Sequence, residues 1–305
     1  MEIYMKIDTN AVVKDKKYKK RDYMGLVYVA PWVIGLLIFQ AYPFISSLIY
    51  SFTKYNIASM EFIGFDNYIR LFKIDKEFYK SVFVTFGYVF MTVPGKLIMA
   101  MIVALILNQK LKGINIVRTI YYIPSLMGGS IAVSILWKLM FMSDGVINKM
   151  LAQVGIVGPN WIGDPKTALP TICLLEIWQF GSSMVLLLAA LKAVPKELYE
   201  AASVDGANKW RMYWKITFPA ISPILFFNLI MQTIQAFQNF TSAFVITNGG
   251  PNKSTYVLGM KLYTEAFSNF KMGYASAVSW VMFVLIMIMT IVLFKTSNRW
   301  VHYDD

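Results

Sequence analysis

The chain has 305 residues, of which 57% are hydrophobic and only 15% are charged, and its mean hydropathy is +0.53. A soluble domain of this length buries too little surface to hide so many apolar side chains, so the composition excludes most soluble enzymes. The net charge of +12 comes from basic residues scattered over the polar segments. Nucleic-acid binding needs a compact basic patch with interleaved aromatic residues, so we expect no nucleic-acid partner.

Six long apolar segments predict six transmembrane helices. A helix needs about 20 mostly apolar residues to cross a bilayer core of roughly 30 Å, and these segments lack the two-residue alternation of a membrane β-barrel. The predicted spans are residues 25–50, 82–107, 119–141, 168–191, 220–243 and 273–294. The sequence therefore predicts an all-α polytopic membrane protein with one transmembrane domain, residues 23–295. The first apolar segment is too long for a cleavable signal peptide, and we expect it to remain as an anchor.

The distribution of basic residues predicts the orientation in the membrane, because cytoplasmic loops carry an excess of Lys and Arg. With the amino terminus inside, the inner segments hold more Lys and Arg than the outer ones. Residues 1–22 and 296–305 are therefore expected to be cytoplasmic tails. The densest basic run, residues 14–21, precedes the first span, where it also suits contact with anionic membrane lipid.

The chain lacks the residues of common catalytic and metal sites. Its single histidine, His302, lies near the carboxyl terminus, and the sequence contains no HExxH, CxxC or GxSxG motif. The one Gly-Lys pair, Gly95-Lys96, is followed by Leu97 rather than by the Ser or Thr of a phosphate-binding P-loop. We therefore predict no catalytic residue and no metal or cofactor site in this chain. The single cysteine, Cys173, lies within the fourth span and is interpreted as a small core residue.

Polar uncharged side chains form a stripe within the fifth span. Asn228, Gln232, Gln235 and Asn239 follow one another at steps of four, three and four, which places them on one face of a helix. One interpretation is hydrogen bonding between helices, and the other is a path for a polyhydroxylated solute such as a sugar. The path hypothesis adds Gln238 beside the stripe and Gln179 in the fourth span. It assigns the apolar faces of the sugar to nearby aromatic residues, which are Trp178, Phe180, Phe237 and Phe240.

Three charged residues lie inside predicted spans, namely Lys96, Lys138 and Glu176. Such residues often mark function, because a charge in the bilayer is costly. Lys138 lies close to the outer end of its span and can reach the interface with its long side chain. Lys96 and Glu176 lie deeper, and the alternatives for them are a neutralising structural pair or a proton relay.

The cytoplasmic loop between the fourth and fifth spans, residues 194–219, predicts two short helices joined by a glycine turn. Pro195 suits a first helical turn, and this helix is expected to continue to about Val204. Gly206 permits a turn at positive φ, where other residues are strained.

The second helix of this loop is expected to have Asp205 or Asn208 as its cap and to end near Pro219 and Pro223. Two helices that protrude from a bundle in this way can dock into a cleft of a soluble protein and move as one lever. The alternative is an ordinary solvated helical hairpin.

The same loop carries the most specific resemblance in the chain. Residues 200–207, Glu-Ala-Ala-Ser-Val-Asp-Gly-Ala, with Ile216, Pro219 and Pro223, resemble the EAA loop of the membrane subunits of binding-protein-dependent ABC importers. Segments 62–68, 118–125, 177–184 and 247–251, the last followed by Ser254 and Thr255, resemble carbohydrate-uptake permeases of the maltose, lactose and glycerol-phosphate type. The likeness covers about residues 23–300, and the chain looks like the first-type permease of a pair.

The resemblance implies an ATP-driven importer with alternating access and several partners. These are a second related permease, an ATPase dimer that binds ATP and Mg, an extracytoplasmic sugar-binding protein and a sugar substrate, in a bacterial cell membrane. The residues that it implies for ATPase coupling are Glu200, Ala201, Ala202, Asp205, Gly206 and Ala207. The turn at Asn248, Gly249, Gly250 and Pro251 is the expected contact with the binding protein, and an ordinary turn is the alternative.

Two functions from other classes stay open at this point. An ion-coupled secondary transporter would need a coupling carboxylate, for which Glu176 is the sole acidic candidate in a span. A non-transporting membrane scaffold would not need the amide stripe at all.

Overall fold

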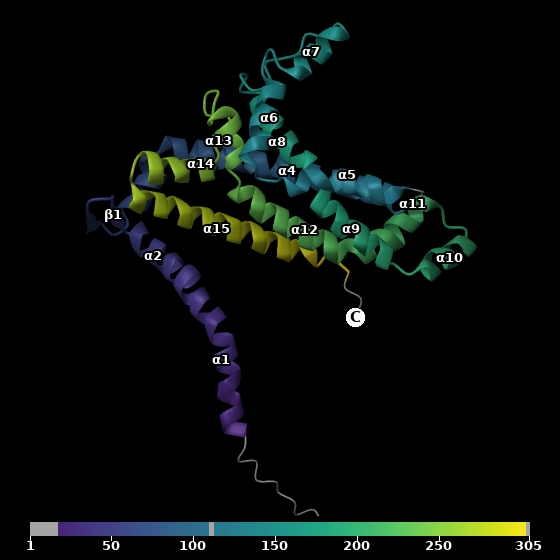
Figure 1. The fold of residues 1–305 in the computed structure, drawn as a ribbon, viewed down its shortest axis with the longest axis horizontal. Coiled ribbons are helices and arrows are strands. Elements are labelled where there is room, and N and C mark those ends of the chain that lie inside the picture. The colour runs from purple at the N-terminus through teal and green to yellow at the C-terminus, as the bar shows by residue number, and fades with distance from the viewer. Residues whose placement is uncertain (1–17, 110–112, 303–305) are drawn as a thin grey trace, which may run out of the picture. The chain divides into compact units, whose positions relative to one another are not determined.

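The computed structural model describes residues 18–109 and 113–302, with side chains described from Met24 onward (Figure 1). The chain divides into two compact units, residues 1–49 and 50–305. Most of the predicted tail at residues 1–22, including the side chains of its basic run, lies outside the described residues, as does the end of the tail at residues 296–305.

The described part of the first unit is one apolar helical run. It consists of α1 (Tyr18–Leu36), the π-helical turn η1 (Leu37–Ala41) and α2 (Tyr42–Ser51), whose last residues enter the second unit. The segment Met24–Ser51 is long and apolar enough to cross a membrane, in agreement with the span predicted at residues 25–50.

The second unit begins with a short antiparallel hairpin, and its other described elements are helices and π-helical turns. The hairpin strands are β1 (Thr53–Tyr55) and β2 (Met60–Phe62), and α3 (Asp66–Ile69) and the π-helical turn η2 (Arg70–Ile74) follow. The next helices in chain order are α4 (Lys76–Leu107), α5 (Ile114–Leu126), α6 (Ile131–Phe141), α7 (Val146–Gln153), α8 (Ala168–Trp178), α9 (Gly181–Ala193) and α10 (Lys196–Val204). The chain ends with α11 (Lys209–Met212), the π-helical turn η3 (Tyr213–Thr217), α12 (Phe218–Gln238), α13 (Thr241–Thr247), α14 (Leu258–Tyr263), the π-helical turn η4 (Thr264–Ser268) and α15 (Met272–Ser297).

The described helices provide five membrane spans, or six if a bent pair is one span. In the second unit, the segments that are long and apolar enough to cross alone are Lys76–Leu107, Ile131–Gln153, Lys209–Gln238 and Met272–Ser297. Helices α8 and α9 meet the same condition together and are bent by 45°. The predicted all-α polytopic membrane fold is confirmed.

The third, fourth and fifth predicted spans are interrupted, the fifth at Asn239 between α12 and α13. Instead of one helix at residues 119–141, the chain forms α5 and α6 around a break that contains Gly128 and Gly129, the latter at a φ of +69°. Glycine is a poor helix former that adopts positive φ without strain, which favours a break here. In the fourth span, Gln179 and Phe180 separate α8 from α9. The prediction of a continuous third helix was therefore wrong, and the fourth helix is bent.

Helix α4 is the centre of the second unit. It packs against α8, α9 and α12, and α12 also packs against α9 and α15 (Figure 1). Ala100 and Ala104 on α4 are fully buried, and their small side chains permit the close approach of neighbouring helices. The cysteine that was interpreted as a core residue, Cys173 on α8, is 1% exposed and belongs to the largest apolar cluster.

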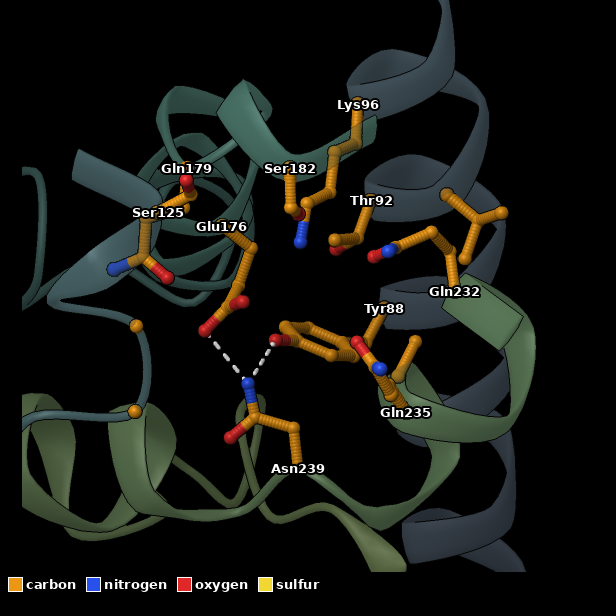
Figure 2. A pocket seen from close by; sticks show the side chains of 14 residues that line it. Tyr88, Thr92, Lys96, Ser125, Glu176, Gln179, Ser182, Gln232, Gln235 and Asn239 are labelled. Carbon is orange, nitrogen blue, oxygen red and sulfur yellow. Dashed lines mark hydrogen bonds between the residues drawn. The ribbon is translucent and has the colours of Figure 1, made fainter. Parts of the chain in front are cut away.

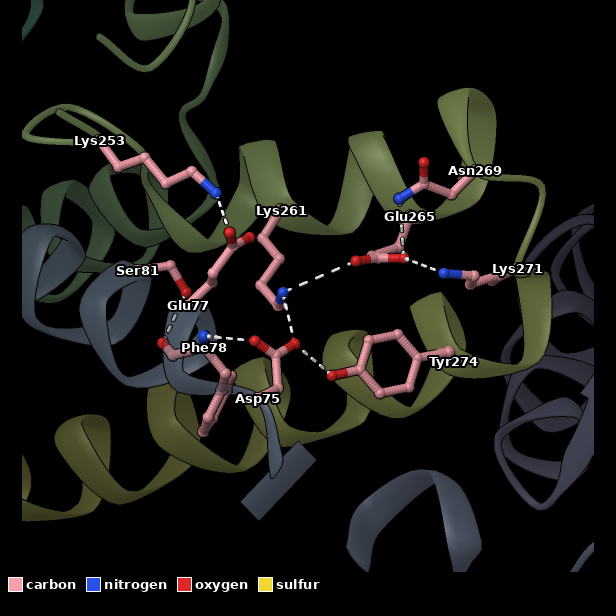
Figure 3. Close-up of polar contacts among 10 residues, drawn as sticks. All are labelled: Asp75, Glu77, Phe78, Ser81, Lys253, Lys261, Glu265, Asn269, Lys271 and Tyr274. Atoms are coloured by element: carbon pink, nitrogen blue, oxygen red, sulfur yellow. Dashed lines mark hydrogen bonds and ion pairs between the residues drawn. The ribbon is translucent and has the colours of Figure 1, made fainter. Parts of the chain in front are cut away.

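A buried ionic network joins the start of α4 to α14, η4 and α15 (Figure 3). Lys261 is 1% exposed, and its Nζ lies 2.6 Å from Asp75 Oδ2 and 3.7 Å from Glu265 Oε1. The Tyr274 hydroxyl donates to Asp75 Oδ2 at 2.5 Å, and Asp75 Oδ1 accepts from the Phe78 backbone N–H at 3.1 Å. Asp75 therefore caps α4, which begins six residues before the predicted span.

We expect Lys261→Met to destabilise the protein. Removing one partner of a buried ion pair leaves an uncompensated charge and costs about 3–5 kcal/mol. The matched control is Lys271→Met, because Lys271 is 46% exposed and lies 3.8 Å from Glu265, a geometry worth at most about 1 kcal/mol. Thermal unfolding in mild detergent measures both, and equal losses in the two variants would contradict the argument.

The same network predicts acid sensitivity. Burial raises the pKa of Asp75, but hydrogen bonds from Lys261 and Tyr274 outweigh burial and hold the pKa below its ordinary value. A carboxyl whose folded pKa is depressed stabilises the fold above its unfolded pKa, and this contribution is lost as pH falls through the folded pKa. We expect the midpoint temperature of thermal unfolding to decrease as the pH is lowered below about 4. This decrease should be less steep in Asp75→Asn. Identical pH profiles would rule out this role of Asp75.

Candidate functional site

A polar cavity of about 240 Å³ lies where α4, α8, α9 and α12 meet (Figure 2). Helix α4 contributes Tyr88, Thr92, Val93 and Lys96, and the end of α12 contributes Gln232, Gln235, Ala236 and Asn239. The remaining walls come from Ser125, Gly128, Gly129, Glu176, Gln179 and Ser182. Amides, hydroxyls and two charged groups thus face one space inside the bundle.

Three helix interruptions meet at this cavity. Gly128 and Gly129 separate α5 from α6, Gln179 lies at the bend between α8 and α9, and Asn239 lies between α12 and α13. Helix ends leave backbone N–H and C=O groups without intrahelical partners. Irregular backbone at membrane depth is tolerated only where it is buried in protein or lines a cavity, so the breaks and the polar side chains occur together.

The interrupted helices are also packed closely against one another. A Cβ added to Gly181, at the start of α9, would lie 2.5 Å from the Tyr121 carbonyl oxygen and 2.8 Å from the Tyr122 Cα on α5. Only a glycine permits this approach of the two backbones. The contact brings the end of α5, with Ser125, to the cavity wall.

Asn239 joins three helices through its side-chain amide. Its Nδ2 donates to the Tyr88 hydroxyl at 2.9 Å and to Glu176 Oε1 at 2.6 Å (Figure 2). The end of α12 is thereby tied to α4 and to α8. The carboxylate of Glu176, one of the charges expected inside a span, receives a donor from an amide.

The structure brings four of the six predicted path residues together. Gln179, Gln232, Gln235 and Asn239 line the cavity. Asn228 does not, because it is 2% exposed and its Nδ2 donates at 3.0 Å to the Ile224 carbonyl one turn earlier. Gln238 is exposed and also lies outside the cavity lining.

The aromatic residues expected at the cavity do not line it. Phe237 is 1% exposed and packs edge to face against Phe86, with ring centroids 5.3 Å apart. Phe180 packs against Tyr121 at 5.8 Å. The aromatic wall of the cavity is instead Tyr88, which sequence analysis missed.

A signal for Tyr88 was present in the sequence. Tyr88, Thr92 and Lys96 follow one another at steps of four on α4, which places a hydroxyl-bearing ring, a hydroxyl and an ammonium on one helical face. Tyr and Thr are also common at apolar helix interfaces, so their spacing alone did not distinguish a cavity wall from a packing surface.

Lys96 and Glu176 both line the cavity without forming a close ion pair. Within the described part of the chain, no carboxylate oxygen lies within 4.0 Å of Lys96 Nζ. Lys96 is nevertheless only 8% exposed. The close neutralising pair considered from the sequence is therefore absent, and Lys138 lies away from the cavity lining.

The loop of residues 194–219 forms the predicted first helix and glycine turn. Helix α10 ends at Val204, and Gly206 adopts a φ of +74°. Asn208 caps α11, since its side-chain oxygen accepts from the Arg211 backbone N–H at 2.8 Å. The hydroxyls of Tyr199 and Thr217 lie 2.8 Å apart and tie α10 to η3.

The second helix of the loop does not end near Pro219 and Pro223, so that prediction was wrong. Helices α11, η3 and α12 form one run of 30 residues, Lys209–Gln238. Pro219 lies in the first turn of α12, directly after a π-helical turn. Pro223 cannot donate to the Pro219 carbonyl, but the Ser222 hydroxyl does so at 2.7 Å.

The residues implied for coupling are on the surface of the loop. Glu200, Ala201, Asp205 and Gly206 are exposed, whereas Ala202 and Ala207 are half-buried. Ala202, Asp205 and Ala207 border a hollow of about 280 Å³ with residues of α11 and η3. Val204 and Trp210 beside it are 89% and 70% exposed, so the loop presents small and apolar side chains outward.

The turn at residues 248–251 is held by the protein itself. Asn248 and Gly249 have φ values of +50° and +78°, and the Thr255 hydroxyl donates to the Gly250 carbonyl at 2.9 Å. Asn248 is exposed, Gly249 is buried, and Gly250 and Pro251 are half-buried. Lys253 forms an ion pair with Glu77 on α4, so the turn is docked on the start of that helix.

Among residues 18–109 and 113–302, no group of three or more His, Cys, Asp or Glu side chains is arranged to hold a metal ion.

Comparison with known proteins gives a family match over most of the chain. Residues 74–302 match the family model described as the binding-protein-dependent transport system inner membrane component. The chain is 46% identical over 300 residues to a probable ABC transporter permease protein, YesP, of Bacillus subtilis, with 97% of each chain covered. It is 33% identical to the trehalose/maltose transport system permease protein MalF of Thermococcus litoralis, covering 95% of this chain and 98% of MalF.

A solved structure has the same fold. It is a bacterial alginate ABC transporter in complex with a periplasmic protein bound to an alginate pentasaccharide. The similarity has a TM-score of 0.80 and 25% identity, and it covers 92% of this chain and 96% of the other.

We expect Asn239→Leu to lower the stability of the protein. The substitution removes the hydrogen bond to the half-buried Glu176 carboxylate, and a hydrogen bond to a charged group contributes about 1.5–3 kcal/mol. Gln238→Leu is the matched control, because the neighbouring Gln238 is exposed and contributes nothing to the cavity wall. Thermal unfolding in mild detergent should show a lower midpoint for Asn239→Leu alone, and a midpoint equal to that of the control would contradict the bridging role.

Proposed function

We propose a function on the basis of the family of this chain, which belongs to the binding-protein-dependent transport system inner membrane components. It is a multi-pass membrane protein and a permease subunit of an ABC importer. The solute that we propose is a carbohydrate. Support comes from relatives that cover nearly the whole chain and are named for sugar transport, such as the Thermococcus litoralis permease.

The observation that carries the carbohydrate proposal is the convergence of three interrupted helices on one amide-lined cavity (Figure 2). Transporters bind solutes at such discontinuous helices near the membrane midplane. The amides of Gln179, Gln232 and Gln235 each offer donors and an acceptor, which matches the mixed character of sugar hydroxyls. The Tyr88 hydroxyl, which accepts from Asn239, adds a further polar group to the cavity wall.

The coupling mechanism that we propose uses the long helix Lys209–Gln238. Glu200, Ala201, Ala202, Asp205, Gly206 and Ala207 would be seated in a cleft of a cytoplasmic ATPase. Movement of this loop passes directly into α12, because α11, η3 and α12 are continuous and Tyr199 ties α10 to the same helix. The other end of that helix carries Gln232, Gln235 and Asn239. ATP-driven closure of the ATPases would therefore move one wall of the cavity and expose it to the outside.

The proposed assembly contains four kinds of protein. This chain pairs with a second related permease, and a dimer of ATPase subunits binds ATP and Mg and supplies the hydrolysis, so this chain is not itself an enzyme. An extracytoplasmic binding protein delivers the sugar and contacts the turn at Asn248, Gly249, Gly250 and Pro251. The proposed location is the bacterial inner membrane with both termini cytoplasmic, as the distribution of Lys and Arg predicts.

Isolation of the tagged chain from its native membrane in mild detergent tests this assembly. We expect one related permease and two copies of an ATPase for each copy of this chain, measured by quantitative mass spectrometry. Recovery of the chain alone or as a homodimer, also after crosslinking, would instead favour an ion-coupled carrier.

We expect Gly206→Val to uncouple transport from ATP hydrolysis. A branched residue at a φ of +74° is strained by about 1–3 kcal/mol, so the turn between α10 and α11 would change its angle. Sugar-stimulated ATP hydrolysis by the complete importer should fall at least about tenfold.

The matched control for this variant is Gly155→Val. Gly155 has a φ of +77° and open space around it, but it lies after α7, outside the coupling loop. Its stimulated rate should stay within about twofold of the wild type. Wild-type stimulation in Gly206→Val, or an equal loss in both variants, would refute the lever.

A further inference from the structure

We infer that the cavity binds an acidic saccharide and that the ammonium of Lys96 holds its carboxylate. This inference rests on the proposed carbohydrate path and specifies which class of sugar the path accepts. The acidic sugar would be a uronic acid, alone or within an oligosaccharide.

The surroundings of two buried lysines carry the argument. Lys261, 1% exposed, lies 2.6 Å from one carboxylate and 3.7 Å from a second, as expected for a buried ammonium that serves the fold. Lys96 is 8% exposed, yet within the described residues no carboxylate lies within 4.0 Å of its Nζ. Glu176 acts on Lys96 only from beyond this distance, and a charge kept in a bundle without direct ion-pair contact is costly, so Lys96 lacks the close partners that Lys261 has.

The position of Lys96 in the cavity indicates that a bound anion would supply the contact that its ammonium lacks. Its side chain enters the same cavity as Thr92, Ser182 and Gln232, all of which carry hydrogen-bond donors (Figure 2). An anion beside Lys96 would therefore meet an ammonium, hydroxyls and an amide. A neutral sugar would leave the ammonium with Glu176, which lines the same cavity beyond ion-pair distance, as its counter-charge.

Glu176 defines the orientation of the bound sugar. Its Oε1 already accepts from Asn239 at 2.6 Å, and it occupies another wall of the cavity. A second carboxylate is repelled from that wall and attracted to Lys96. The acidic group of the sugar thus lies at the Lys96 wall, and its hydroxyls extend towards Gln179 and Gln235.

The test uses the complete importer, reconstituted with its binding protein in liposomes. The probes are a panel of uronic-acid di- and trisaccharides, the carboxyl-reduced neutral form of each, and hexose phosphates. The measurement is saccharide-stimulated ATP hydrolysis by the wild type and by the variants Lys96→Gln, Lys96→Arg and Lys138→Gln. The same binding protein serves all variants, so a difference between them comes from the permease.

We expect the uronic-acid sugars to stimulate best and Lys96→Gln to reduce this stimulation at least about tenfold, since hydrogen bonds to charged groups are strong. Lys96→Arg keeps the positive charge and should recover most of the stimulation. Lys138→Gln removes an intramembrane lysine outside the cavity and should stay within about twofold of the wild type.

A second measurement needs no substitution and no binding protein. A small amine-reactive reagent labels Lys96 in the purified wild-type importer, and mass spectrometry follows the labelling rate of its peptide. A bound uronic-acid sugar should slow the labelling of Lys96 at least about tenfold, whereas the carboxyl-reduced sugar should not. The peptide that contains Lys138 is the internal control.

The outcomes separate this inference from the proposed function. Four results would overturn the acidic-saccharide site while leaving a carbohydrate importer. Three concern ATP hydrolysis: equal stimulation by neutral and acidic sugars, an unchanged response to acidic sugars in Lys96→Gln, or a preference for hexose phosphates. The fourth is equal labelling of Lys96 with and without the uronic-acid sugar. Stimulation by no sugar in the panel would overturn the carbohydrate function itself, and the inference with it.

Discussion

The backbone hydrogen bond is the constraint on which this structure depends. Inside a bilayer no water satisfies a free N–H or C=O group, so helices that cross must be continuous unless protein or a cavity receives their broken ends. This chain breaks or bends three helices, after α5, after α8 and after α12, and all three interruptions adjoin one cavity. The polar side chains lie at the same cavity because they, like the free backbone groups, need hydrogen-bond partners that lipid cannot supply. The cavity is therefore a consequence of where the helices end.

The helix that stays continuous is as informative as those that break. Lys209–Gln238 contains two prolines and a π-helical turn and still runs for 30 residues, about 45 Å at 1.5 Å per residue. The Ser222 hydroxyl replaces the donor that Pro223 lacks, so the helix keeps its hydrogen bonding at its weakest point. One continuous helical run thus links an exposed loop at one end to the amide wall of the cavity at the other. In the proposed importer, an ATPase movement that displaces the loop would therefore also displace α12 and change the shape of the cavity.

The sequence predicted those features that depend on the length of the apolar segments and on the helical spacing of polar residues within them. The length of the apolar segments identified the membrane fold, and the spacing of Gln232, Gln235 and Asn239 identified one cavity wall. The breaks were not predicted, because Gly128 and Gly129 are compatible with both a close helix contact and a helix end. Pro219 and Pro223 predict a helix end from the sequence alone, because the hydrogen bond of the Ser222 hydroxyl that compensates for Pro223 is visible only in three dimensions. The Tyr88 wall was missed because its spacing also fits an ordinary packing surface.

The charged side chains are subject to the same constraint as the backbone breaks, because each needs a partner or a cavity inside the bilayer. Asp75, Glu265 and Lys261 satisfy one another, and this network joins the start of α4 to α14, η4 and α15. Glu176 is satisfied by an amide at the cavity wall, which still leaves its charge facing the cavity. Among the described residues no carboxylate lies within 4.0 Å of the Lys96 ammonium, on which Glu176 acts only from a greater distance, although Lys96 lies on the helix that forms the centre of the bundle. A charge that a membrane protein keeps at a cavity wall without direct ion-pair contact is a functional-site hypothesis by default, and for Lys96 the proposed acidic sugar supplies the missing contact.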